Sequence, residues 1–331
     1  MFEGKKVLVT GGSGMIGRSL CQLLIERGAI VVATSLDRLE DTLPSECQFV
    51  SADLRNLEEC KRLAKGADIV FHLAGVTGSP RMTLAAPSTF FVSNLLVNTN
   101  MLEAATFCGV KKYLYTSTYG VYGPVGDMTE EGMWDQSPSE ADKYAGWAKR
   151  MGELQVEANR EQYDWQDLYI VRPANVYGPG ANFDPENSMV VASLIRRVLS
   201  GENPLTVWGD GSAVRDFIFS EDVARGMIFV VENDIQEPLN LGSGIGTSIA
   251  ELVKVIVQHY EGEVGVVWDE SKPTGDKKRI LDMTKCHEYG FTARTSLESG
   301  IKTTMTWYDQ DQEQIRGRFN AFREAGRLEK F

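Results

Sequence analysis

Features that would assign this sequence to several other protein classes are scarce or absent. Only three residues are histidine, so the chain has no histidine cluster for metal binding. The five cysteines are scattered without a C-x-x-C pair, which argues against a zinc site or a disulfide framework. No segment reaches the ~18 consecutive apolar residues of a membrane span, and no signal-peptide pattern opens the chain. We therefore expect a cytoplasmic protein with no metal and no membrane partner.

The charge balance argues against a further class. The formal net charge is −12, which disfavours a surface for nucleic acid. A local basic pocket for a small anionic ligand remains compatible with that charge. Apolar residues make up 43% of the chain, which is enough for one large α/β domain or for two unequal lobes.

Strand-like and helical patterns alternate through about residue 175. The strand-like segments are 6–10, 30–34, 48–52, 69–74, 113–117 and 168–172, and helical patterns include 88–107 and 149–160. This alternation predicts an α/β fold, a Rossmann-like doubly wound parallel sheet. From about residue 178 proline, glycine and asparagine become frequent, which predicts a smaller C-terminal α/β substrate lobe.

The predicted boundaries follow from this change. Residues 1–177, with returning segments at about 214–243, are expected to form a dinucleotide-binding domain, and 178–213 with 244–331 the substrate lobe. Within the second part we expect helices at 189–199 and 247–259 and strands at 205–208 and 264–268. The short apolar segments 217–219 and 238–241 are expected to return to the large sheet.

Residues 7–20, VLVTGGSGMIGRSL, are the most informative stretch. An apolar strand enters a turn with Gly11, Gly14 and Gly17, and a helical pattern starts at Met15 and Ile16. Such a strand–turn–helix unit presents backbone N–H groups and the positive end of a helix dipole to a pyrophosphate. The spacing is G-x-x-G-x-x-G, not the G-x-G-x-x-G of the dehydrogenase fingerprint. A glycine-rich turn without a ligand is the bland alternative; the position at the first strand favours a dinucleotide.

The end of the second strand bears on the choice of cofactor. Ser35 falls where an acid for the ribose hydroxyls of NAD is usual, and Arg38 follows three residues later. A small hydroxyl with a guanidinium suits a 2′-phosphate, so NADP is predicted, with NAD possible if Asp37 is the ribose acid. After the third and fourth strands we expect cofactor contacts from Asp53, Leu54, Leu73, Ala74 and Gly75.

Several motifs together carry a resemblance to a known family. FHLAG, TSTYGVYGP, GWAKRMGE and RPANVYGPG resemble the extended short-chain dehydrogenase/reductases, and within them the nucleotide-sugar epimerases and reductases, including those that form GDP-L-fucose. The likeness runs nearly end to end. It implies a tyrosine acid/base, a lysine four residues later and a Ser/Thr hydroxyl at the neighbouring strand end. It also implies cofactor contacts from Pro173, Asn175 and Val176.

The catalytic positions match only in part. Thr118 takes the hydroxyl position and Lys149 takes the lysine position, but Ala145 stands where the tyrosine belongs. Three explanations stay open: an engineered removal of the tyrosine, a natural departure in which Tyr144 supplies the phenol, or a chain that uses no tyrosine. Because one residue is ~100° of helix rotation, Tyr144 would need a local distortion to reach the same place.

Two further departures bear on the reaction. The relatives that also epimerise use a cysteine and a histidine, and this chain has Gly120 and Met189 at those positions. Neither residue can move a proton, so 3,5-epimerisation is predicted to be absent.

The resemblance also implies a nucleotide-diphosphate sugar as partner. Arg215 and Arg279 are the expected diphosphate ligands, because guanidinium groups bind phosphate bidentately. The remaining candidates for this substrate are Thr118, Tyr119, Asn175, Asn182, Arg197, Trp208 and Lys272. Helices 88–107 and 149–160 are apolar on more than one side, which in this family implies a homodimer through a four-helix bundle.

The first functional hypothesis is an NADP-dependent reductase of a nucleotide-linked, GDP-type 4-keto-6-deoxy sugar or heptose in surface-polysaccharide synthesis, with impaired catalysis if Ala145 replaces a needed tyrosine. A nucleotide-sugar 4-epimerase or dehydratase is the second. The residues after Thr118 are Tyr119 and Gly120, without the acidic pair that a dehydratase usually needs. The third is a non-catalytic nucleotide-binding protein.

Overall fold

The computed structural model of the chain describes residues 1–37, 39, 42–124, 127–272 and 276–310. Its centre is a seven-stranded sheet in the order β10-β6-β5-β4-β1-β2-β3, with every neighbouring pair parallel. The strands are β1 (Lys6–Thr10), β2 (Ile30–Ser35), β3 (Gln48–Ser51), β4 (Ile69–His72), β5 (Lys112–Thr116), β6 (Leu168–Pro173) and β10 (Leu239–Leu241). The predicted Rossmann-like fold is confirmed.

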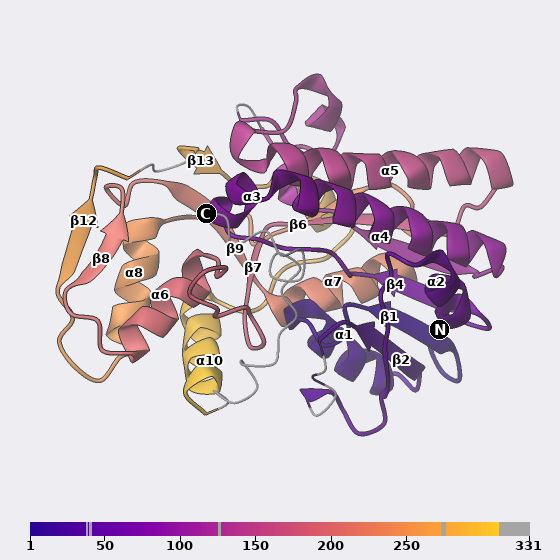
Figure 1. Cartoon of the computed structure of the whole chain (residues 1–331), viewed down its shortest axis with the longest axis horizontal. Helices are drawn as coiled ribbons and strands as arrows, with labels where there is room; N and C mark the ends of the chain where they lie inside the picture. Colours follow the sequence, from indigo (N-terminus) through magenta and orange to yellow (C-terminus); the bar gives the residue numbers. More distant parts are fainter. Residues whose placement is uncertain (38, 40–41, 125–126, 273–275, 311–331) are drawn as a thin grey trace.

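Helices cover both faces of this sheet (Figure 1). On one face pack α2 (Leu57–Ala64), α4 (Pro87–Phe107) and α5 (Lys143–Tyr163), and on the other α1 (Met15–Ile25) and α7 (Ser220–Glu232). Strand β1 serves both layers, since Val7 and Val9 face α1 and α7 while Leu8 faces α2 and α4. Burial on both faces explains why its sequence is a continuous apolar run.

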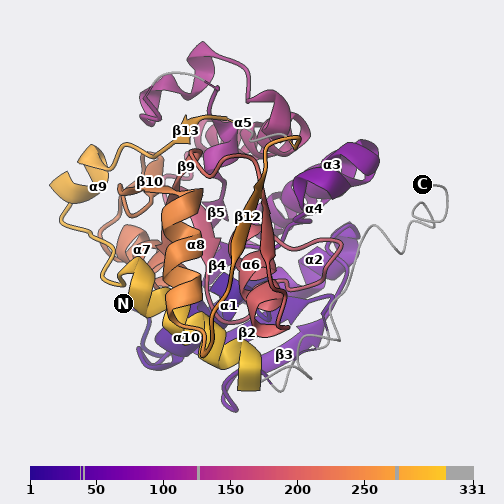
Figure 2. The same ribbon diagram turned by 90° about the vertical axis from the view of Figure 1, so that its left-hand side faces the viewer.

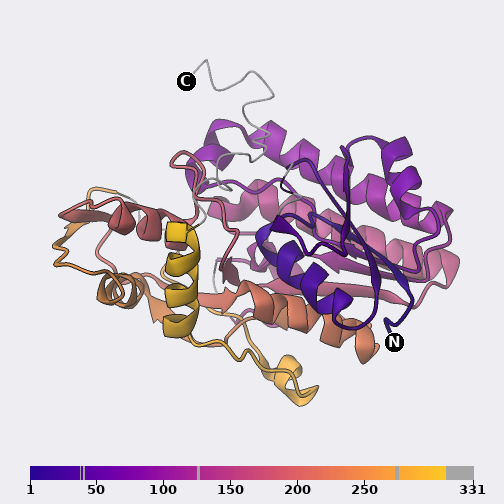
Figure 3. The same cartoon turned by 90° about the horizontal axis from the view of Figure 1, so that it is seen from below.

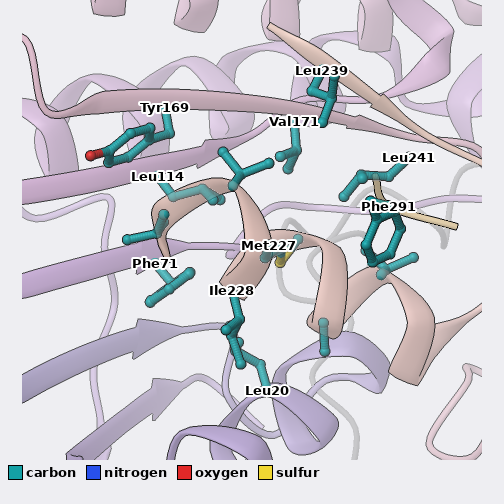
Figure 4. Packing of buried hydrophobic residues seen from close by; sticks show 14 of the residues in the cluster. Leu20, Phe71, Leu114, Tyr169, Val171, Met227, Ile228, Leu239, Leu241 and Phe291 are labelled. Carbon is teal, nitrogen blue, oxygen red and sulfur yellow. The ribbon is translucent and has the colours of Figure 1, made fainter. Parts of the chain in front are cut away.

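Figure 4 shows the core under α7, where Met227 and Ile228 meet Leu20 of α1 and the sheet residues Phe71 and Leu114. All five side chains are at most 1% exposed. This packing fixes α1, and with it the loop that precedes α1, against the sheet.

A second group of elements lies beyond one end of the large sheet (Figures 1 and 2). Strand β9 (Val214–Phe219) pairs with β7 (Asn175–Tyr177), β11 (Gly246–Ser248) and β13 (Lys278–Arg279), and β8 (Leu205–Trp208) pairs with β12 (Val266–Asp269). Around them pack α6 (Val190–Leu199), α8 (Ile249–Gln258) and α10 (Leu297–Gln310). Figure 3 shows α10 between this lobe and the large domain.

The predicted returning segments have opposite outcomes. Segment 238–241 contains β10, which joins the large sheet beside β6 as predicted. The prediction for 217–219 is wrong, because these residues belong to β9 in the smaller sheet. An apolar run shows that a strand is buried but not which sheet it joins, and β9 buries Phe217 and Phe219 against α6 and α8. The domain boundaries themselves stay a prediction.

The shorter elements include α3 (Pro80–Ala85), α9 (Thr284–Glu288) and 3-10 turns at Tyr119–Val121, Glu131–Asp135 and Glu140–Asp142. Among the described residues no helix is both long and apolar enough to cross a membrane.

Candidate active site

The loop between β1 and α1 leaves no room for side chains at its glycine positions. A Cβ at Gly12 would lie 2.5 Å from the Cβ of Ala33 on β2, and one at Gly17 would lie 2.3 Å from the Gly11 carbonyl oxygen. Gly11 has a φ of +68°, which other residues rarely adopt. Gly14 heads α1 without a side-chain cap, followed by the half-buried Met15 and Ile16. The loop therefore fits a dinucleotide pyrophosphate, held by backbone N–H groups at the helix N-terminus.

The loop lies where the strand order of the sheet reverses. Strand β1 is flanked by β2 on one side and by β4 on the other, and the chain leaves β4 through Leu73, Ala74 and Gly75. The Thr10 hydroxyl accepts hydrogen bonds from the N–H groups of Leu73 (3.1 Å) and Ala74 (3.0 Å). Ligands of open α/β sheets bind at this kind of switch point, outside the carboxyl ends of the strands.

A buried series of hydrogen-bonded polar side chains lies beneath the switch point, and no sequence pattern predicted it. Thr10 Oγ1 lies 2.8 Å from Nδ1 of His72, whose Nε2 lies 3.3 Å from Oδ1 of Asn98. The Asn98 amide donates to the Tyr115 hydroxyl at 2.9 Å. Burial lowers the pKa of His72 to about 3, with the charge of Lys149 adding to the effect, so the imidazole is neutral. His72 therefore acts as a neutral hydrogen-bonding group that links Thr10 of β1 with Asn98 of α4.

The predicted ribose end of the cofactor site is formed by the ends of β2 and β3. The hydroxyl of Ser35 accepts a hydrogen bond from the N–H of Asp37 at 3.3 Å, and Arg38 lies outside the described residues. Asp53 binds the Arg55 side chain through both carboxylate oxygens, and this hydrogen bonding lowers the pKa of Asp53. Leu54 is buried in the core below.

Lys149 reaches from α5 toward the end of β4. Its ammonium donates to the Thr116 carbonyl at 2.8 Å and lies 5.1 Å from the centre of the Tyr115 ring. A Cβ on Gly75 would be 3.7 Å from Nζ, so the ammonium faces the exposed backbone that follows β4. Burial lowers the pKa of Lys149 to about 8. The group is thus a cation of unusually low basicity at the predicted nicotinamide position.

The turn after β5 is held by a second buried network. Ser117 donates to Glu153 of α5, and the Arg172 guanidinium of β6 binds the same carboxylate at 2.7 Å. Arg172 also donates to the Tyr122 hydroxyl at 2.9 Å. Next in the chain, Thr118 is half-buried, and its hydroxyl accepts from the N–H of Gly120 at 3.2 Å. The network fixes the strand end that presents Thr118.

The start of α5 separates Tyr144 from Ala145. The helix is regular from Lys143, and Tyr144 is 38% exposed and meets the edge of Phe91 on α4. Ala145 packs instead against the apolar cluster of Val76, Met82, Ala86 and Phe90. The distortion that would bring Tyr144 to the tyrosine position is absent from this part of the chain, and its catalytic role stays a prediction.

Arg215 and Arg279 come together as expected. They are direct partners in the register of β9 and β13. Arg279 is 3% exposed, donates to the Tyr119 carbonyl at 3.1 Å and lies 5.0 Å from the centre of that tyrosine ring. Arg215 donates to the carbonyl of Asp276 at 2.7 Å. Arg279 of the second lobe thus reaches the turn that carries Thr118, with Arg215 beside it on the neighbouring strand.

The other predicted substrate residues are distributed more widely. Asn175, the first residue of β7, donates to the Asp216 carbonyl of β9 at 3.0 Å. Pro173 ends β6 two residues earlier, and Val176 follows Asn175 in β7. Asn182 lies in the turn that ends at Asn187, whose Oδ1 accepts from the N–H of Ser79 at 2.8 Å.

Three predicted residues lie apart from this cluster. Arg197 binds Glu202 and the carbonyl of Thr206 inside the second lobe. Trp208 is 59% exposed, with the ammonium of Lys272 6.0 Å from the centre of its ring. Their roles in substrate binding stay predictions.

Among the described residues no group of three or more histidine, cysteine or acidic side chains could hold a metal ion. A parallel sheet with a glycine-lined loop at its switch point, and a lysine of α5 that faces the backbone after the neighbouring strand β4, defines a dinucleotide-binding enzyme of the Rossmann class. The family model of the NAD dependent epimerase/dehydratase family matches residues 7–242. The chain belongs to this family, and its cofactor is a nicotinamide dinucleotide.

Individual relatives match over nearly the whole chain. A probable GDP-L-fucose synthase of Oryza sativa is 30% identical, covering 92% of this chain and 92% of that protein. A dTDP-4-dehydro-6-deoxy-D-allose reductase of Streptomyces bikiniensis is 28% identical, covering 93% and 97%. The crystal structure of a UDP-glucose 4-epimerase with UDP-glucose from Thermotoga maritima superimposes with a TM-score of 0.80 at 30% identity, covering 93% of this chain and 99% of that one. All three names are those of enzymes of nucleotide-linked sugars.

Proposed function

We propose that the protein is an NADP-dependent reductase of a nucleotide-linked 4-keto-6-deoxy sugar or heptose, of the GDP type, and that it does not epimerise carbons 3 and 5. The observation that carries the proposal is the position of the Lys149 ammonium, which binds the Thr116 carbonyl, two residues before Thr118, and faces Gly75; Gly120 has no side chain that could move a proton. The likeness to a GDP-L-fucose synthase and to a 4-dehydro-deoxysugar reductase supports the substrate class.

The residues of the site have separable tasks in this reaction. The bound nicotinamide supplies the hydride. The glycine loop holds the pyrophosphate of the cofactor. The Lys149 ammonium holds the ribose that is attached to the nicotinamide ring. The Thr118 hydroxyl donates a hydrogen bond to the keto oxygen, which stabilises the negative charge that develops there. Arg215 and Arg279 bind the diphosphate of the substrate through charge-assisted hydrogen bonds.

The test is turnover in deuterated water. A GDP-linked 4-keto-6-deoxy hexose should be reduced with consumption of one NADPH per sugar, and the product should carry no deuterium at carbon 3 or carbon 5. Deuterium at either carbon would contradict the absence of epimerisation. Interconversion of sugars without net NADPH consumption would favour the 4-epimerase alternative, and cofactor binding without turnover of any sugar would favour the non-catalytic one.

Cofactor choice gives a separate prediction at Ser35. A carboxylate there would repel a 2′-phosphate and accept hydrogen bonds from the ribose hydroxyls of NADH. In Ser35→Asp we expect the dissociation constant for NADPH to rise by about tenfold or more, since one charge-assisted contact is worth ~1.5–3 kcal/mol. Affinity for NADH should be kept or improved. Fluorescence titration with both cofactors measures this, and an unchanged ratio of the two constants would show that Ser35 does not face the ribose.

We also propose that two copies associate through α4 and α5. These helices pack side by side and leave apolar side chains exposed, including Val92 (45%), Leu96 (42%) and Leu154 (46%). An apolar surface shared by two adjacent helices suits an isologous four-helix contact. Sedimentation equilibrium should give twice the mass of the chain; a monomer at micromolar concentration would exclude this contact.

A further inference from the structure

A second ionisable group, which the sequence patterns do not single out, lies at the start of α5, the helix that carries Lys149. Asp142 immediately precedes the helix, seven residues before Lys149. Asp142 is the N-cap residue, closes the 3-10 turn Glu140–Asp142, and lies four residues before Gly146, where α5 meets the Gly120 carbonyl. Tyr144 is five residues from Lys149, which turns it by ~140° to another side.

The Asp142 carboxyl lies against the turn that carries Thr118. A Cβ built on Gly120 would be 3.3 Å from Cγ of Asp142 and 3.3 Å from Cγ2 of Thr118. The carboxyl and the methyl group of Thr118 therefore both adjoin Gly120, so closely that a side chain at residue 120 would crowd them. The helix comes this close because Gly146 also lacks one: a Cβ there would be 2.3 Å from the Gly120 carbonyl oxygen.

The charged groups around Asp142 come from several elements. Nη1 of Arg279 on β13 lies 3.2 Å from the Asp142 carboxylate and 2.8 Å from that of Asp276. The Asp142 carboxyl is also faced by Arg215 of β9, by Tyr119 of the turn after β5 and by Ser139. Burial raises the pKa of Asp142 and the neighbouring Asp276 adds to this, while Arg279, Arg215 and Ser139 act in the opposite direction. Its side chain stays 27% exposed, so water reaches it.

The family's tyrosine position offers no acid of its own in this chain. Ala145 is packed among Val76, Met82, Ala86 and Phe90, all of them apolar. Thr118, with an ordinary hydroxyl, can orient the keto oxygen but cannot supply a proton at neutral pH. In the described part of the chain, Asp142 is the acidic group that adjoins both Gly120 and Thr118 at the start of α5.

We propose that Asp142 is the proton donor of the reduction, the catalytic acid that replaces the missing tyrosine. The inference rests on the proposed reductase activity. A bound reduced nicotinamide would supply the hydride to the keto carbon and would itself be oxidised. The keto oxygen takes the proton of the Asp142 carboxyl, so the O–H bond of the acid breaks as the hydroxyl of the product forms. Asp142 remains as a carboxylate and regains a proton from water.

The experiment compares Asp142→Asn with Asp276→Asn. Both substitutions remove one carboxylate from the same nitrogen of Arg279, but only Asp142 adjoins Thr118. Asp142→Asn should lower kcat by about 10²-fold or more, the usual size of a lost general acid, with NADPH affinity and melting temperature near those of the wild type. Asp276→Asn should change mainly KM, and Asp142→Glu should recover part of the lost kcat.

A readout without cofactor or substrate accompanies the kinetics. The ¹³C resonance of the Asp142 carboxyl, assigned by its loss in Asp142→Asn, should titrate in the ligand-free protein above the ordinary aspartate pKa of ~3.9. Titration at or below that value would overturn the proposal. Equal losses of kcat in the two asparagine variants would also overturn it, because Asp142 would then act only as an ion-pair partner of Arg279, as Asp276 does.

Other outcomes separate this inference from the proposed function. If the wild type reduces no 4-keto sugar, the proposed function fails before Asp142 is tested. If the wild type is active and Asp142→Asn keeps that activity, only the inference fails, and loss of activity in Tyr144→Phe would then assign the proton to Tyr144. Deuterium incorporation at carbon 3 or 5 that disappears in Asp142→Asn would make Asp142 a base toward carbon and would overturn its role as donor to oxygen.

Discussion

Replacement of Lys149 by methionine should lower kcat by about 10²-fold, because a nicotinamide that is no longer held in place is misplaced relative to the keto carbon. Methionine keeps the length of the side chain but removes the ammonium that faces Gly75 and binds the Thr116 carbonyl. Steady-state oxidation of NADPH with a nucleotide-linked 4-keto sugar measures the loss. Fluorescence titration should show weaker NADPH binding by the same variant.

The pH dependence adds a second test of Lys149. Because its pKa is about 8, the ammonium is charged below that pH and neutral above it. Wild-type turnover should therefore fall as the pH rises through about 8, and the variant should lack this decline. Lys143→Met, six residues earlier on an exposed part of the same helix, is the matched control and should keep its turnover. A Lys149→Met enzyme whose kcat is within about a factor of three of the wild-type value would contradict the assignment of Lys149 to the cofactor site, because a lost catalytic contact costs at least about tenfold.

Loss of Glu153 should destabilise the whole protein. Its carboxylate is fully buried and binds Ser117 and the equally buried Arg172. In Glu153→Leu the Arg172 charge would remain in the core with no carboxylate partner, which costs about 3–5 kcal/mol. Urea unfolding followed by tryptophan fluorescence measures the change in the free energy of unfolding.

Two further variants show whether the cost comes from the stranded charge. The double variant Glu153→Leu with Arg172→Met should be more stable than Glu153→Leu alone, because it removes the buried cation as well. Arg62→Leu breaks an exposed ion pair with Glu59 and should cost no more than about 1 kcal/mol. If Glu153→Leu costs no more than Arg62→Leu, the buried network does not hold the Thr118 turn in place.

The parts of the structure that follow from local pattern were predictable. Strand β1 and the start of α1 were expected from an apolar run that enters a glycine turn, and β8 matches its expected range at both ends. The glycine at position 12 follows from sterics alone, since a Cβ there would lie 2.5 Å from the Cβ of Ala33. The pairing of Arg215 with Arg279 also agrees with the expectation from their motifs.

Partners that lie far apart in the sequence were not predictable from pattern. The run at Phe217 and Phe219 does not reveal which sheet it joins, so β9 was assigned to the wrong one. Asp142 is one acid among many in an acidic chain, and its contact with Gly120 arises only when α5 packs on the turn after β5. The network of Thr10, His72 and Asn98 joins three elements, and no spacing in the sequence signals it.

The central claim is that the glycine loop after β1 binds a nicotinamide dinucleotide, so that Lys149 and Thr118 meet at its reactive ring. Isothermal titration calorimetry of the purified chain with NADPH and with NADH tests this claim most directly. We expect saturable binding of at least one of them at one site per chain, with NADPH binding more tightly. An absence of binding for both cofactors would contradict it.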